Sequence, residues 1–489
     1  MAGGLEAIRG PLALPGRRNL LLVLLFVSAV AALGAGTVEG GRVGVVCGSL
    51  LVLAVAAPTV WRLRSDPLDA PGIYALVSAI TLGAFSLLWI GSPRAPAPGI
   101  GQSDVARALL VVAAGVVAFG VGARLTGRAR RPAPLRFPAS EAPPQRLIVG
   151  LFLIGSIGLA AGLALGVLGY NSRTAERSGF LAAAQAISQL AAAGSFAVLV
   201  CALSAFGADR RRYTRLLLVL LCLQVLGGFT AGYKLQSILP ALLVGFAFVA
   251  CRLRIPWRPL AIGVVASVLV LAPANYVYRQ YLNRAPNGPS RSFFDSVKYG
   301  AEGFASSRLR LIDSVAVIHA QTPSVYAYGN GRLYRDLPAI ILVPRALWPS
   351  KPVLEDALEF SHTYWRIPTV VDTLTPITQV GDLLRNFAVV GVIVGLAIWG
   401  ALLGLFAAAC RRRPSPRLAA VYIVGLATSV VFVEIDLPEV LAVAGKTLPV
   451  TGVLAWTLLP GDNAPAGYRR ALAWLRGHAE PPVDRATRA

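Results

Sequence analysis

The residues with the most distinctive types and spacing lie in one polar stretch late in the chain. This stretch contains the run Val-Pro-Arg-Ala-Leu-Trp-Pro-Ser-Lys-Pro at 343–352. Three prolines fix the backbone φ angle within nine residues, so Arg345 and Lys351 project from a stiffened backbone. The planar guanidinium of Arg345 can bind two phosphate oxygens, and the Lys351 ammonium adds a point charge. Both suit a diphosphate group at a membrane surface. The run is also typical of an interfacial anchor, with Trp348 at the headgroup level.

A cluster of groups that can accept a proton follows this run. Glu355, Glu359 and His362 lie within eight residues of one another, and the aromatic Tyr364 lies just beyond them. Imidazole titrates near neutral pH, so we expect His362 to act as a general base toward a sugar hydroxyl. The two carboxylates are the alternatives. Acids in an exposed loop are more often simply solvated.

Three further cations lie in short connections elsewhere in the chain. Arg173 and Arg177 belong to the sequence Asn-Ser-Arg-Thr-Ala-Glu-Arg, and Lys234 follows Thr-Ala-Gly-Tyr. An ionisable residue between two apolar segments is a functional candidate, although it can also extend harmlessly to the membrane surface. We therefore expect these cations, with Arg345, Lys351, Trp348 and Tyr364, to contact an anionic substrate.

The elements that carry these residues are predicted to be membrane-spanning helices. The chain is 56% hydrophobic and 14% charged, with a mean hydropathy of +0.65, which is typical of an all-α polytopic membrane protein. We expect about twelve spans. The apolar windows are 20–33, 43–60, 72–91, 105–123, 147–168, 181–206, 216–230, 235–250, 260–274, 387–409, 418–433 and 440–459.

Membrane topology explains most of the formal charge of +23. If twelve spans alternate, 27 basic and 8 acidic residues fall on one side, which is the positive-inside pattern. Both termini are then cytoplasmic, and nucleic acid is not an expected partner. Residues 1–277 hold nine spans, 278–385 form a long extracytoplasmic loop, 386–460 hold three spans and 461–489 form a cytoplasmic tail.

The long loop is predicted to contain short structural elements of its own. Helical spacing over 293–321 predicts a helix that lies on the membrane or caps the bundle. Residues 326–332 read as a turn, and the apolar run 337–343 as a re-entrant or interfacial piece. None of the five cysteines and only two of the three histidines lie in the loop, so we expect no metal site. No phosphate-cradling GxxxxGK[ST] motif or other cofactor signature is present.

Several of these features occur together in one known family. They are the twelve-odd spans, one long loop late in the chain, the Gly-x-Lys turn at 232–234, the Tyr-Gly-Asn-Gly turn at 328–331 and the run at 343–352. In this combination the chain resembles the O-antigen and oligosaccharide repeat-unit polymerases of bacterial surface polysaccharide pathways, the Wzy-type proteins. The family often has a Gly-Glu and an Asn-Phe-Gly before the next helix, where this chain has Asp382 and Ala388.

The resemblance covers about residues 173–404 and implies a metal-independent, GT-C-like glycosyltransferase of the bacterial plasma (inner) membrane. It would transfer a glycan with inversion from a polyprenyl diphosphate to a hydroxyl on another lipid-linked repeat unit. Donor and acceptor lipids are the implied substrates, and a chain-length regulator and a flippase are the implied partner proteins. Arg345 and Lys351 would neutralise the departing diphosphate.

Two alternatives remain. A ligase that moves finished glycan to a different acceptor would share this architecture. A flippase or other transporter of lipid-linked oligosaccharide would be expected to carry charges inside its spans, and the apolar windows here are nearly free of charge.

Overall fold

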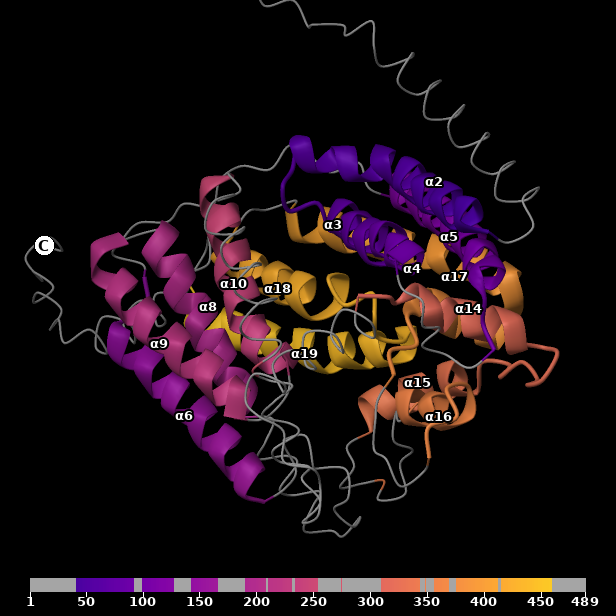
Figure 1. The fold of residues 1–489 in the computed structure, drawn as a ribbon. Helices are drawn as coiled ribbons and strands as arrows, with labels where there is room; N and C mark the ends of the chain where they lie inside the picture. Colours follow the sequence, from indigo (N-terminus) through magenta and orange to yellow (C-terminus); the bar gives the residue numbers. More distant parts are fainter. Residues whose placement is uncertain are drawn as a thin grey trace, which may run out of the picture.

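The computed structural model describes residues 41–91, 99–126, 142–165, 190–207, 210–230, 234–253, 274, 309–343, 348, 356–368, 375–411 and 415–459. All regular structure in these residues is helical (Figure 1). The elements are α2 Arg42–Val60, η1 Trp61–Arg64, α3 Ala70–Ser78, η2 Ala79–Gly83, η3 Ala84–Leu87, α4 Leu88–Gly91, α5 Gln102–Thr126, α6 Gln145–Ala164, α8 Ala191–Gly207, α9 Arg210–Thr230, α10 Lys234–Arg252, α14 Ile312–Gln321, α15 Arg332–Leu342, α16 Asp356–Thr363, α17 Gln379–Arg411, α18 Pro416–Gly425, η7 Leu426–Val430 and α19 Leu437–Leu458.

The described part of the chain contains seven helical segments that are long and apolar enough to cross a membrane, and three shorter apolar helices. Together they account for ten of the twelve predicted windows. The windows 20–33 and 260–274 lie outside the described residues, except for Ala274. The prediction of an all-helical chain with several spans is therefore confirmed for these residues. The count of twelve and the long loop stay predictions.

The helices form two groups joined by α18 and α19 (Figure 1). One group contains α6, α8, α9 and α10, and the other is built around α2, α5 and α17. Helices α15 and α16 lie beside the second group, below α14 in this view. The cavity described below lies where α15 and α16 meet α17 of the second group.

Helices α5 and α17 pack closely because glycines bring their backbones together. A Cβ atom at Gly122 would overlap the carbonyl oxygen of Ala397, and one at Gly400 would overlap that of Phe119. The Thr126 hydroxyl then donates to the carbonyl of Ala401 at 3.0 Å. Small residues at such contacts allow the close van der Waals packing that associates helices in lipid. Gly115 faces Val392 and Leu396, whereas Thr126 faces Ala401, so α5 and α17 run parallel, as alternation predicts for the fourth and tenth windows.

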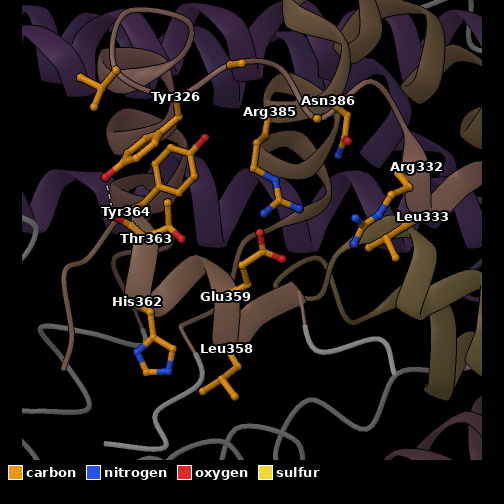
Figure 2. Close-up of a pocket in the computed structure, with 13 residues that line it drawn as sticks. Tyr326, Arg332, Leu333, Leu358, Glu359, His362, Thr363, Tyr364, Arg385 and Asn386 are labelled. Carbon is orange, nitrogen blue, oxygen red and sulfur yellow. Dashed lines mark hydrogen bonds between the residues drawn. The ribbon is translucent and has the colours of Figure 1, made fainter. Parts of the chain in front are cut away.

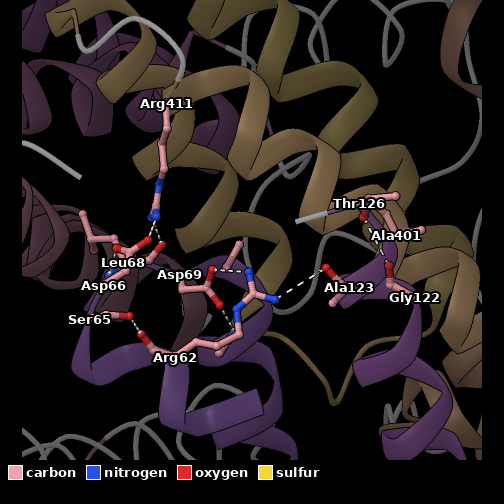
Figure 3. Close-up of polar contacts among 12 residues, drawn as sticks. Arg62, Ser65, Asp66, Leu68, Asp69, Gly122, Ala123, Thr126, Ala401 and Arg411 are labelled. Carbon is pink, nitrogen blue, oxygen red and sulfur yellow. Dashed lines mark hydrogen bonds and ion pairs between the residues drawn. The ribbon is translucent and has the colours of Figure 1, made fainter. Parts of the chain in front are cut away.

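A cluster of paired charges closes the end of this group where α2 meets α3 (Figure 3). We call Arg62, Asp66, Asp69, Arg411 and Tyr422 the basic-end cluster. Its Arg62 guanidinium pairs with Asp69 at 2.9 Å, and Arg411 pairs with Asp66. Arg411 also donates to the Tyr422 hydroxyl at 2.9 Å.

The carboxylate of Asp69 has a second role in the basic-end cluster. It accepts the amide N–H of Gly72 at 2.9 Å and so caps the first turn of α3. Burial raises the pKa of Asp69, against the opposing effect of Arg62. The cluster ties α2, α3, α17 and α18 together, so we interpret it as structural.

Helix α14 is the described part of the predicted helix 293–321, and it does not lie on the membrane surface. Every residue from Ile312 to Ile318 is buried, and the helix packs between α5 and α17. This position excludes a membrane-surface helix and agrees with the capping alternative. The apolar run 337–343 is the end of the amphipathic helix α15, whose Ile341 packs on Gly445 of α19, and its re-entrant or interfacial position stays a prediction.

A buried ion pair precedes and opens α14. Arg310 lies 3.3 Å from Asp313, and both side chains are at most 2% exposed. The indole N–H of Trp89 donates to the other oxygen of Asp313, and the Arg310 guanidinium lies over the Trp89 ring. Burial raises the pKa of Asp313 to about 7, against the lowering effect of Arg310. Burial also disfavours the charged form of Arg310 and so lowers the pKa of its guanidinium.

Candidate functional site

A cavity of about 760 Å³ opens where the segment after α14, the start of α15, helix α16 and the first turns of α17 meet (Figure 2). Its lining contains two arginines, a carboxylate, an imidazole and two tyrosines. The lining residues are Val325, Tyr326, Ala327, Gly329, Arg332, Leu333, Leu358, Glu359, His362, Thr363, Tyr364, Arg385 and Asn386. Glu359, His362 and Tyr364 are residues that the sequence singles out, and the structure brings them to one cavity.

Helix α16 presents Glu359 and His362 to the cavity from adjacent turns. Both residues line the cavity, and their side chains point in different directions from the helix. The opposite face is fixed by Phe360, which is fully buried, and by Ser361, whose hydroxyl bonds Thr375 at 2.9 Å. This packing leaves the helix no freedom to rotate its polar face away from the cavity.

The tautomer of His362 follows from its hydrogen bond. Its Nδ1 lies 2.9 Å from the carbonyl oxygen of Ile367, and a carbonyl can only accept. In the neutral ring Nδ1 therefore carries the proton and Nε2 keeps its lone pair. A ring held in this tautomer can accept a proton at Nε2.

Two tyrosines form an aromatic wall of the cavity. The rings of Tyr326 and Tyr364 have centroids 4.8 Å apart. The Tyr326 hydroxyl donates to the Thr363 carbonyl at 2.8 Å, and the Tyr364 hydroxyl shares a hydrogen bond with Thr322 at 2.7 Å. Burial raises the pKa of Tyr364, so this phenol stays protonated. The wall offers an apolar, rigid surface beside the polar groups.

The cations of the cavity are Arg332, the first residue of α15, and Arg385, near the start of α17. Figure 2 shows the Glu359 carboxylate pointing toward Arg385, with His362 directed away from both arginines. The sequence alone assigns neither arginine a role, although Arg332 ends the predicted turn 326–332 and Arg385 is the last residue of the predicted loop. The position of Arg385 at the cavity depends on a break in α17, which follows it and which the sequence does not indicate.

Helix α17 is interrupted two residues beyond Arg385. Phe387 has φ −136° and ψ 17°, and Ala388 has φ 58° and ψ −164°, so a short helical segment precedes the spanning part. The break releases the Arg385 carbonyl, which accepts the N–H of Gly329 at 3.2 Å. The positive φ falls at Ala388, where the resembled family often has glycine. This geometry holds the predicted turn 326–332 against α17.

The remaining predicted site residues are placed in part. Trp348 is half-buried in the chain between α15 and α16, and Lys234 is the first residue of α10, though its side chain lies outside the described residues. Arg173, Arg177, Arg345, Lys351 and Glu355 also lie outside them. The run 343–352 therefore connects two helices that line the cavity, and its cations stay a prediction.

No three His, Cys, Asp or Glu side chains among the described residues lie together in a way that could hold a metal ion. The lining instead combines guanidinium groups, which bind phosphate oxygens, with two groups that can accept a proton. Comparisons with protein-family models, with curated proteins and with solved structures found no match to this chain.

Proposed function

We propose that this chain is an integral membrane glycosyltransferase that polymerises polyprenyl-diphosphate-linked oligosaccharide repeat units. The observation that carries the proposal is the cavity where Arg332 and Arg385 share a lining with Glu359 and His362. A glycosyl transfer from a lipid diphosphate needs cations for the leaving group and a base for the acceptor hydroxyl. The resemblance of the sequence to Wzy-type polymerases supplies the substrate class.

In the proposed reaction an acceptor hydroxyl oxygen attacks the anomeric carbon of the donor sugar. The bond from that carbon to the diphosphate oxygen breaks, and the diphosphate leaves with the electron pair and is stabilised by arginine. Arg385 and Arg332 would take this role together with Arg345 and Lys351, since the run 343–352 joins α15 to α16. The tyrosine wall of Tyr326 and Tyr364 would contact the sugar rings.

The acceptor proton has two candidate destinations in the cavity. The sequence favours His362, and the fixed tautomer leaves its Nε2 able to accept a proton. Glu359 points toward Arg385, so it lies nearer the proposed diphosphate site than His362 does. We expect Glu359→Gln or His362→Ala to abolish polymer formation while the lipid-linked donor accumulates. If both variants make normal polymer, neither group is the base.

Deletion of the gene from its host tests the proposed activity. A polymerase deletion should remove long-chain glycan while single lipid-linked repeat units reach the outer face of the membrane. Loss of a ligase would instead leave long glycan on the lipid carrier, and loss of a flippase would leave single units on the cytoplasmic face. Sizing the lipid-linked glycans and testing their access to an added glycosidase separates the three outcomes.

The proposed location is the bacterial plasma membrane, with both termini in the cytoplasm and residues 278–385 outside. The sorting of 27 basic residues to one side supports this orientation. A reporter fused at residue 320 should be active only outside the cytoplasm. A cytoplasmic reporter signal at that position would contradict the proposed outer-face reaction.

A further inference from the structure

A single buried carboxylate beneath the cavity links the two helices that carry its arginines. Asp382 of α17 is fully buried and does not line the cavity. Its Oδ2 accepts the hydroxyl of Tyr334 on α15, and its Oδ1 accepts the side-chain N–H of Asn386 at 2.9 Å. The same Oδ1 lies 3.9 Å from the Arg385 guanidinium. One carboxylate thus contacts both elements that present cations to the site.

The contacts continue through Asn386 to the turn that precedes α15. The Asn386 side-chain oxygen accepts the N–H of Gly331 at 3.1 Å, while its Nδ2 also donates to the Asp382 carbonyl at 3.0 Å. Gly331 has φ +66°, and a Cβ there would overlap the Phe387 ring. The start of α15, and with it Arg332, is therefore fixed against the broken end of α17.

We propose that Asp382 is a positioning residue that orients Arg385 and anchors α15, so that Arg385 and Arg332 can bind a diphosphate together. Three observations support this role: the carboxylate is fully buried, it contacts both elements, and it has no place in the cavity lining. A buried carboxylate that accepts two hydrogen bonds and faces a guanidinium keeps that guanidinium in one direction. The inference rests on the proposed function, because the diphosphate is the ligand of that proposal.

Asp382 is not the general base in this assignment. Its two oxygens already face Tyr334, Asn386 and Arg385, and its side chain has no exposed surface. A base must reach the acceptor proton directly or through one water. The resembled family often has a glutamate in this position, but here the shorter carboxylate acts through its neighbours.

The test measures binding of farnesyl diphosphate, a short-chain probe, to the purified full chain in lipid nanodiscs. We expect the native protein to bind it and Asp382→Asn to bind about tenfold more weakly, because the oriented charge is lost. Arg385→Gln should weaken binding by at least as much. The double variant should bind less than tenfold more weakly than Arg385→Gln alone, because the part of the Asp382 effect that acts through Arg385 is already lost.

Each result has a distinct meaning. Native affinity in a folded Asp382→Asn variant, or a double variant weaker by the product of both effects, would overturn the positioning role and leave the proposed function intact. Absence of probe binding to the native protein would overturn the diphosphate site, and the positioning role with it. If Asp382→Asn weakens the binding of farnesyl monophosphate by the same factor, the variant has lost structure generally, and this result would also overturn the positioning role.

A second variant keeps the test decisive if Asp382→Asn does not fold. Tyr334→Phe removes only the hydroxyl that Asp382 accepts and keeps the ring that packs on Phe387. We expect it to weaken farnesyl diphosphate binding by about threefold, also when Arg385 is already Gln, because it acts through the alignment of α15 and Arg332. Unchanged affinity in Tyr334→Phe would show that α15 is not aligned through this contact.

Discussion

The basic-end cluster and the cavity use the same residue types in opposite ways. In the basic-end cluster the guanidinium of Arg411 contacts Asp66, the Tyr422 hydroxyl and the Leu68 carbonyl. At the cavity Arg332 and Arg385 border a volume of about 760 Å³. Charges that satisfy one another hold helices together, and charges beside open volume can bind a ligand. Among the 46 Lys and Arg residues of the chain, we therefore interpret the arginines of the basic-end cluster as structural and propose ligand binding for those at the cavity.

The largest expected effect is on turnover at the cavity. We expect Arg385→Ala to lower the rate of glycan polymerisation by about two to three orders of magnitude, as for loss of a preorganised charge. Arg385→Lys should recover only part of the rate because the planar fork is absent. Initial rates would be measured in nanodiscs with lipid-linked repeat units extracted from the deletion strain, per folded molecule. Arg62→Ala in the basic-end cluster is the matched control. An equal loss of rate in that variant would contradict a ligand-binding role that is specific to the cavity arginines.

The basic-end cluster should respond in stability instead. Arg411→Gln leaves Asp66 buried without its charged partner, and we expect a loss of about 3–5 kcal/mol in the free energy of unfolding. Titration with SDS in mixed micelles measures this loss. Arg335→Gln is the control, since Arg335 is 78% exposed in its pair with Asp336 and should change stability by at most about 0.5 kcal/mol. Similar effects of both variants would argue against a structural cluster.

The Arg310 and Asp313 pair at the start of α14 tests the comparison at a third place, because it is buried like the basic-end cluster. Folding raises the pKa of Asp313 from 3.8 to about 7 because the carboxyl is buried. Between these values the folded protein holds a proton that the unfolded chain has released. Stability is therefore greatest below about pH 4 for this group and falls as the pH rises to about 7.

We expect Asp313→Asn to remove this part of the pH dependence. The measurement is the SDS unfolding midpoint between pH 5 and pH 8 for the native chain and the variant. Asp336→Asn serves as the control because its side chain is partly exposed. Identical slopes for the native chain and Asp313→Asn would mean that this carboxyl does not couple to folding.

The smallest expected effect concerns the backbone that supports the cavity. Ala388 has φ 58° and ψ −164°, a region in which a Cβ atom costs about 1–3 kcal/mol. Ala388→Gly should stabilise the protein by about 1 kcal/mol, less the entropy gained by the unfolded chain. Ala409→Gly, in a regular and exposed part of α17, should destabilise it by about 1 kcal/mol. Two changes of the same sign would show that Ala388 is not strained.

The sequence predicts the spanning helices well because long apolar windows have few other solutions. It also predicts a turn before α15 from its Gly and Asn residues, and it singles out Glu359, His362 and Tyr364, which the structure brings to one cavity; their catalytic or binding roles stay predictions. The burial of α14 could not be predicted, because the buried pair Arg310 and Asp313 also needs Trp89, whose indole contacts both residues and lies 224 positions before Asp313. Arg385 and Asp382 could not be assigned for a similar reason. Their proposed roles depend on the helix break at Phe387 and Ala388, and neither Phe nor Ala is a residue type that breaks helices.

Every lining residue that the structure describes lies between Val325 and Asn386. Helices α5 and α19 pack against α17 and α15, and none of their described side chains lines the cavity. The cavity is therefore inherited as a single block of chain. If the proposed function holds, we expect exchange of that block by recombination to change the preferred glycan without altering the packing of the spanning helices. Chimeras with junctions near residues 309 and 391 would show whether substrate preference travels with the block.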